Sequence, residues 1–108
     1  MGTIDKNSIS YRTEQKLRQY AREAWRDQPK SFLGFEIDML ADMIKQFREW
    51  EHTCWHGSVE HMELLWRVRL VWRVLNNLKH ITDEQYWEIY QDTEKLYESI
   101  KPKGEEEQ

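Results

Sequence analysis

The chain has 108 residues, enough for a single domain, and its one cysteine excludes an internal disulfide framework. The net charge is −4 and 33% of residues are charged, but 13% are aromatic, which is too many for a disordered polar chain. Four glycines and two prolines allow few turns and argue against a barrel or sandwich of short strands. No apolar stretch approaches the roughly 20 residues of a membrane span, and residues 1–10 contain no signal-peptide region. We therefore expect a soluble, cytoplasmic, helical domain.

The first helix is predicted at residues 11–27. Its apolar residues recur on one helical face, at Leu17, Tyr20, Ala21, Ala24 and Trp25. Pro29 ends this helix, because a residue that precedes proline is pushed out of the helical region. Tyr20 and Trp25 are therefore expected in the core.

The second helix is predicted at residues 31–52. One apolar stripe runs along it, formed by Leu33, Ile37, Leu40, Ile44 and Phe47. The stripe is widened by Phe32, Phe35, Met39, Met43 and Trp50. A break follows, in which Gly57 supplies a flexible point and Ser58 is the expected N-cap of the next helix.

The third helix is predicted at residues 59–80. A heptad seam steps by four, three, four and three residues through Leu64, Val68, Val71, Leu75 and Leu78. This spacing is typical of helices that pack in a bundle. Val71 lies at the middle of the seam, so the seam predicts that Val71 is buried.

The fourth helix is predicted from Thr82 to about Ile100. Its start, Thr82 followed three residues later by Gln85, has the pattern of a capping box. Short connections between successive helices favour antiparallel neighbours, so the expected fold is an all-α, up-down-up-down four-helix bundle over residues 11–100. Residues 1–10 and the acidic residues 101–108 are expected to be disordered.

The third helix carries more apolar and aromatic surface than one seam needs. The surplus residues are Met62, Leu65, Trp66, Arg69 and Arg73. Aromatic residues, Met and Arg are the types enriched at protein interfaces, so this set predicts an oligomer or partner interface. The alternative is a wide core in which Trp66 is partly buried and the arginine stems cover it.

Basic residues are concentrated in two parts of the chain. Arg18, Arg22 and Arg26 recur every four residues along one edge of the first helix, and Arg67 begins a second basic run that contains no acid. Such cations can bind the phosphates of a nucleic-acid backbone. A solvated helix face has the same pattern, and the acids of the fourth helix are possible partners for the first row.

Catalytic and metal chemistry have little support in the sequence. His52, Cys54, His56 and His61 include residue types that bind zinc or copper, but the segment lies at a helix end and packing within a loop is the favoured interpretation. No phosphate-binding glycine loop or nucleophile motif occurs. We therefore expect neither a catalytic residue, a metal site nor a cofactor.

The third and fourth helices also carry a family resemblance. The run from Met62 to Leu75, which contains Arg-Leu-Val-Trp-Arg, is followed by an Ile-Thr-x-x-Gln helix start at Ile81 and by Leu-Tyr-Glu-Ser-Ile, ending at Ile100. Together they resemble the accessory variability determinant proteins of diversity-generating retroelements, within the 23S rRNA intervening-sequence family of four-helix bundles. The resemblance covers roughly residues 15–100. It departs from the family in charge, since such proteins are expected to be strongly basic.

This resemblance implies a function. Members of the family are non-catalytic and assemble as homopentamers. They bind the retroelement's reverse transcriptase and RNA or RNA–DNA hybrid, and they support mutagenic reverse transcription. Two other hypotheses remain open: a small phage-type adaptor or inhibitor that binds protein alone, and, well behind it, a helical metal-dependent or nucleotide-handling enzyme.

Overall fold

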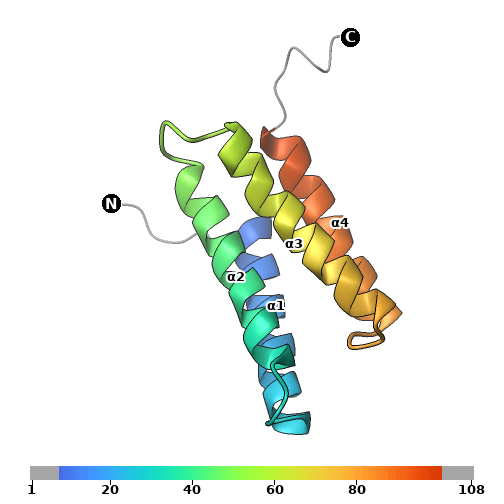
Figure 1. Ribbon diagram of the computed structural model, residues 1–108. Coiled ribbons are helices and arrows are strands. Elements are labelled where there is room, and N and C mark those ends of the chain that lie inside the picture. The colour runs from blue at the N-terminus through green and yellow to red at the C-terminus, as the bar shows by residue number, and fades with distance from the viewer. Residues whose placement is uncertain (1–7, 101–108) are drawn as a thin grey trace.

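The computed structural model describes residues 8–100 and consists of helices joined by short loops. The four helices are α1 (Ile9–Asp27), α2 (Leu33–Trp50), α3 (Val59–Asn77) and α4 (Asp83–Ile100). Successive helices run in opposite directions (Figure 1). The predicted all-α four-helix bundle is confirmed, and no strand occurs within residues 8–100.

Each helix packs against two others. The contacting pairs are α1–α2, α2–α3, α3–α4 and α1–α4, so α1 lies diagonally from α3 and α2 from α4. The α1–α2 pair and the α3–α4 pair diverge toward the end of the bundle that carries the α1–α2 and α3–α4 loops (Figure 1). This diagonal arrangement separates surfaces on α1 from surfaces on α3.

The helix boundaries follow local capping chemistry. The Ser58 hydroxyl accepts a hydrogen bond from the His61 backbone N–H at 3.0 Å, which confirms the predicted N-cap of α3. At the start of α4, the Thr82 hydroxyl accepts from the backbone N–H of Gln85, and the Gln85 side chain accepts from that of Thr82. This reciprocal pair is the predicted capping box. Gly57 has a φ of 74°, a conformation that glycine adopts without steric cost.

The core is formed by one face of each helix. Its fully buried members include Leu17, Ala21, Ile37, Leu40, Ile44, Phe47, Val68, Trp72 and Ile89. Trp72 is the largest of them. Its indole N–H donates to the backbone carbonyl of Tyr86 at 3.2 Å, so its polar atom is satisfied inside the core.

The predicted seam of α3 is wrong, because the observed seam begins three residues earlier. The buried positions are His61, Leu65, Val68, Trp72 and Leu75. They repeat with the same steps of four and three, shifted along the helix. Val68 and Leu75 belong to both seams, but Leu64 and Val71 are half-buried and Leu78 is 59% exposed. The shift places the indole of Trp72 in the core, which removes more apolar surface from water than burying Val71 does.

Several large side chains expected in the core lie at the surface. Trp25 is 39% exposed and Tyr20 is half-buried. Phe32, Phe35 and Met39 are all exposed, because the core face of α2 is already complete with its buried stripe from Leu33 to Phe47. The apolar surface of α2 is therefore wider than the core that it faces.

The predicted disordered ends fall largely outside the described residues. The structure does not describe residues 1–7 and 101–108. The predicted boundary at residue 10 is wrong, because Ser8 caps α1 by accepting from the Tyr11 backbone N–H and Ile9 begins the helix. None of the helices within residues 8–100 combines the length and the apolar character needed to cross a membrane.

Candidate interaction surface

A groove lies between the outer sides of α3 and α4. We call it the arginine–aromatic groove; it encloses about 410 Å³ and is lined by Trp66, Arg69, Leu70, Arg73, Tyr86, Tyr90 and Glu94. Three of the five predicted interface residues line it. Of the other two, Met62 is half-buried beside the core, and Leu65 is only 1% exposed. The assignment of Leu65 to an interface is therefore wrong, because this residue belongs to the core seam of α3.

Arg69 fixes the shape of the groove. Its guanidinium lies over the Tyr90 ring at 4.4 Å and over the Trp66 ring at 5.1 Å, and it forms an ion pair with Glu94 at 3.2 Å. The edge of Trp66 also meets the ring of Tyr97, with 5.7 Å between ring centres. Arg69 is thus a structural element of the groove whose charge is offset by Glu94.

Trp66 and Arg73 are side chains of the groove that remain available to a partner. Trp66 is 51% exposed although it contacts Arg69 and Tyr97. Arg73 is exposed and makes no ion pair with any of residues 8–100. An aromatic side chain that its neighbours hold in place, next to an arginine without an ion pair, is typical of interface positions that contribute strongly to binding.

The predicted row of arginines on α1 is not a continuous cationic surface. Arg18 forms ion pairs with Glu14 at 2.9 Å, Asp38 at 2.8 Å and Asp42 at 2.9 Å. Partial burial opposes its charge, but the hydrogen bonds to these carboxylates outweigh burial and raise the pKa of Arg18. The prediction that Arg18 binds nucleic acid is therefore not supported by its surroundings, since its charge is used to join α1 to α2.

The other predicted nucleic-acid residues are exposed but lie apart. Arg22 bonds the Gln19 side chain, and Arg26 pairs with the adjacent Asp27 at 3.1 Å. Arg67 is exposed on α3, which makes no contact with α1. The four residues therefore do not form one site within a single subunit.

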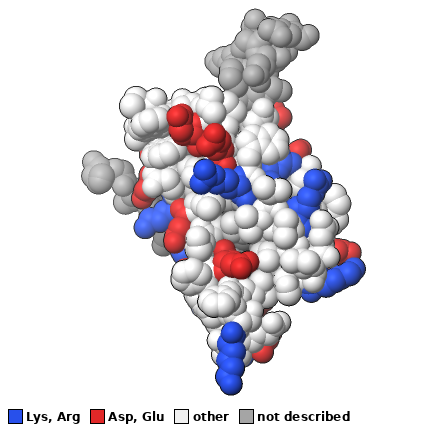
Figure 2. Space-filling model, in the orientation of Figure 1, with Lys and Arg blue, Asp and Glu red and all other residues white. Residues whose placement is uncertain are grey.

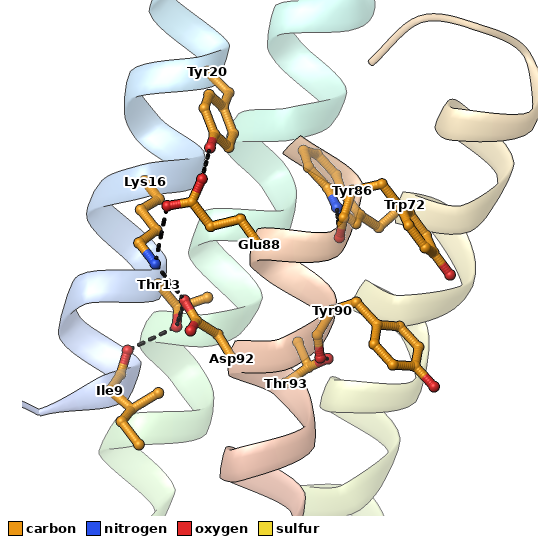
Figure 3. Close-up of polar contacts among 10 residues, drawn as sticks. All are labelled: Ile9, Thr13, Lys16, Tyr20, Trp72, Tyr86, Glu88, Tyr90, Asp92 and Thr93. Carbon is orange, nitrogen blue, oxygen red and sulfur yellow. Dashed lines mark hydrogen bonds and ion pairs between the residues drawn. The ribbon is translucent and has the colours of Figure 1, made fainter. Parts of the chain in front are cut away.

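Acids of α4 pair with a different cation of α1. Lys16 contacts Glu88 at 3.2 Å and Asp92 at 3.0 Å, and the Tyr20 hydroxyl donates to Glu88 at 2.7 Å (Figure 3). The Thr13 hydroxyl adds a bond to Asp92 at 3.1 Å. Burial opposes the charge of Lys16, but Asp92 and Glu88 raise its pKa. This network joins α1 to α4. Because Lys16 is paired with two carboxylates, its positive charge is not available to bind a phosphate.

Of the histidines considered as loop residues or metal ligands, His52 and His56 are exposed, whereas His61 lies in the core. His61 is fully buried, its Nδ1 accepts from the Gly57 backbone N–H at 3.0 Å, and its Nε2 bonds the Phe47 carbonyl at 2.8 Å. Both ring nitrogens are occupied, which leaves none for a metal. Within residues 8–100, no cluster of three or more His, Cys, Asp or Glu side chains is arranged to hold a metal ion.

A second apolar surface was missed as a candidate site by sequence reasoning. Phe32, Phe35 and Met39 are 79%, 58% and 45% exposed, and they follow one outer side of α2. Their spacing of three and four residues was visible in the sequence, where it was interpreted only as a widening of the apolar stripe of the second helix. Only the position of α1 and α3 beside α2 shows that these side chains face outward.

Comparisons with known proteins do not identify a family for this chain. No protein-family model, no curated protein and no solved structure matches this chain.

Proposed function

We propose that this protein is a non-catalytic accessory subunit of a diversity-generating retroelement. In this proposal it assembles as a homo-oligomer, expected to be a pentamer, and binds the reverse transcriptase and its template RNA or RNA–DNA hybrid. The resemblance of residues 62–100 to accessory variability determinant proteins suggests this function, and the four-helix bundle is compatible with it.

The arginine–aromatic groove is the observation that carries the proposal. It lies on α3, within the run from Met62 to Leu75 that bears the resemblance, and it presents Trp66 and Arg73 to a partner. Aromatic and arginine anchors of this kind suit a protein–protein interface. The groove supports both self-association and contact with a polymerase.

Nucleic-acid binding in this proposal depends on assembly. Arg22, Arg26 and Arg67 are exposed cations, but one subunit has a net charge of −4 and places Arg67 on α3, apart from Arg22 and Arg26 on α1. An oligomer repeats them, and multivalent contact strengthens binding that is weak for one subunit. We therefore expect binding only by the assembled protein and steep weakening with salt.

The test measures assembly and binding on the same sample. Light scattering should give a mass several times the 13.4 kDa of one chain, and fluorescence polarisation should show salt-dependent binding to structured RNA or RNA–DNA hybrid. A variant with Ala at Arg22 and Arg26, which lie on α1 outside the arginine–aromatic groove, should stay assembled and lose most RNA affinity. The matched control replaces the exposed residues Lys45 and Lys95 with Ala, and should lose less.

The reverse transcriptase is tested by co-purification. The wild-type chain should retain a diversity-generating reverse transcriptase, and Trp66→Glu should weaken this retention while leaving helicity intact. If the protein neither assembles nor binds nucleic acid, the accessory function is rejected. The alternative adaptor or inhibitor, which uses the same groove on a protein partner alone, then becomes the better explanation.

A further inference from the structure

We propose that the outer face of α2 docks on the outer face of α3 in a second copy of this chain. The α2 face consists of Phe32, Phe35 and Met39, and the α3 face consists of Trp66, Leu70 and Val74 beside the arginine–aromatic groove. The inference rests on the self-association in the proposed function and names the two surfaces that meet.

The α2 face is apolar without being part of the core. Phe35 and Met39 are one helical turn apart, and Phe32 precedes them by about one turn, so the three lie along one side of the helix. The core side of α2 is opposite and is complete, with Ile37 and Leu40 buried. Single exposed apolar residues are ordinary, but three in a row on one helix side indicate an interaction surface.

The α3 face has the same character. Trp66, Leu70 and Val74 recur every four residues and are 51%, 63% and 45% exposed. They lie away from the buried seam that contains Val68 and Trp72. Leu70 also lines the arginine–aromatic groove, so this face and the groove form one continuous surface.

Charge determines which faces meet. Exposed Glu36 and Asp42 border the α2 face; Asp42 is paired with Arg18 of the same chain, whereas Glu36 makes no ion pair with any of residues 8–100. Exposed Arg67 and Arg73 border the α3 face, and neither has an ion-pair partner within the described chain. One exposed acid, Glu63, lies on the same side of α3 one turn before Trp66, so the arginines leave this face with a net positive charge. Figure 2 shows a red patch surrounded by white surface over the lower part of α2, and both blue and red side chains along the right margin, over α3 and α4.

A contact between like faces places charges of one sign together. Pairing two α2 faces brings carboxylates into proximity, and pairing two α3 faces does the same for arginines. Pairing α2 with α3 brings the unpaired Glu36 to a face bordered by unpaired arginines, which is the favourable arrangement. Because the two faces differ, the contact is head-to-tail, and repeating it produces a closed ring when the rotation between copies allows closure.

The experiment uses two variants, each with one face disrupted. Phe35→Glu adds a charge to the α2 face, and Leu70→Glu adds one to the α3 face; both positions are exposed, so the bundle is preserved. Gln91→Glu, at an exposed position of α4 outside both faces, is the matched control. Light scattering after gel filtration gives the mass, and circular dichroism gives the helicity.

The decisive sample is an equimolar mixture of the two face variants. We expect the wild type and Gln91→Glu to assemble, each face variant alone to be a 13.4 kDa monomer, and the mixture to form a 1:1 heterodimer. The heterodimer forms because one variant keeps an intact α3 face and the other an intact α2 face. Met39→Glu and Val74→Glu form a second pair that replaces any variant with reduced helicity.

Three results overturn the inference: a mixture that stays monomeric, a face variant that keeps the wild-type mass, or a wild type that is monomeric throughout. RNA binding and reverse-transcriptase co-purification on the same wild-type sample test the proposed function separately. Assembly through other faces with RNA binding retained rejects only the inference. Assembly through these faces without RNA or polymerase binding rejects only the accessory function.

Discussion

Val68 and Val71 differ in burial although the sequence presents both as seam positions. Val68 is fully buried and Val71 is half-buried on the flank of α3. Val68→Asp should lower the free energy of unfolding by about 3–5 kcal/mol, the cost of an uncompensated buried charge. Val71→Asp, in which the carboxylate can reach water, should cost no more than about 1–2 kcal/mol. Urea denaturation compares the two, and equal costs would contradict the seam through Trp72.

His61 makes the fold sensitive to mild acid. Burial lowers its pKa below the ordinary value of 6.5, the Phe47 carbonyl partly opposes this, and nearby His56 lowers it further. Gly57 donates to Nδ1, so the folded state holds the neutral ring with its proton on Nε2. Protonation of Nδ1 removes that hydrogen bond.

The sign of the resulting pH dependence follows from proton uptake. Below about pH 6.5 the unfolded chain binds a proton at His61 that the folded chain excludes, so stability is full above this pH and falls as the pH drops toward the lowered folded pKa. The loss is at most about 1.4 kcal/mol per pH unit from this residue. Urea midpoints between pH 7.5 and 5 measure it. His61→Gln should flatten the profile and His56→Gln should not; a flat wild-type profile contradicts the prediction.

At the scale of elements, α1 and α2 are joined by a close contact between Gly34 and Trp25. A Cβ placed on Gly34 comes within 2.7 Å of the Trp25 ring, so any side chain there displaces the indole. Gly34→Ala should therefore be destabilising in the wild type, despite the gain of up to about 1 kcal/mol in helix propensity.

In a Trp25→Ala background the same substitution should stabilise the protein by up to about 1 kcal/mol, because only helix propensity remains. Thermal unfolding of the four proteins in this double-mutant cycle measures the coupling. An identical effect of Gly34→Ala in both backgrounds would show that the indole does not pack on this glycine.

Within single helices, the sequence alone predicted the features that depend on residues close together in the chain. The N-cap at Ser58 and the capping box of Thr82 and Gln85 involve residues three apart, and both were predictable. The core face of α3 was not predictable in this way. Two overlapping seams have the same spacing, and only the environment of Trp72, including its bond to the Tyr86 carbonyl, distinguishes them.

For the whole molecule, the shared core predicts one cooperative unfolding transition. Each helix packs on two neighbours, and buried residues from every helix meet in one cluster. Neither the α1–α2 pair nor the α3–α4 pair has a separate core. Melting curves from far-ultraviolet circular dichroism and from tryptophan fluorescence should therefore coincide. Two separated transitions would show that the pairs fold independently.

The sequence by itself determined the number of helices, their approximate bounds and the four-helix architecture, because helical periodicity and capping depend on residues within a few turns of one another. It also placed Trp66 and Arg73 outside the core of α3, where both are exposed. The tertiary structure decided which cations are free. Arg18 is paired with Asp38 and Asp42, which are distant in sequence and reach it only because α2 packs antiparallel on α1. It likewise decided that Leu65 is core and that Phe35 is surface. An apolar residue becomes buried only where a neighbouring helix covers it, and that depends on how the helices are arranged in space.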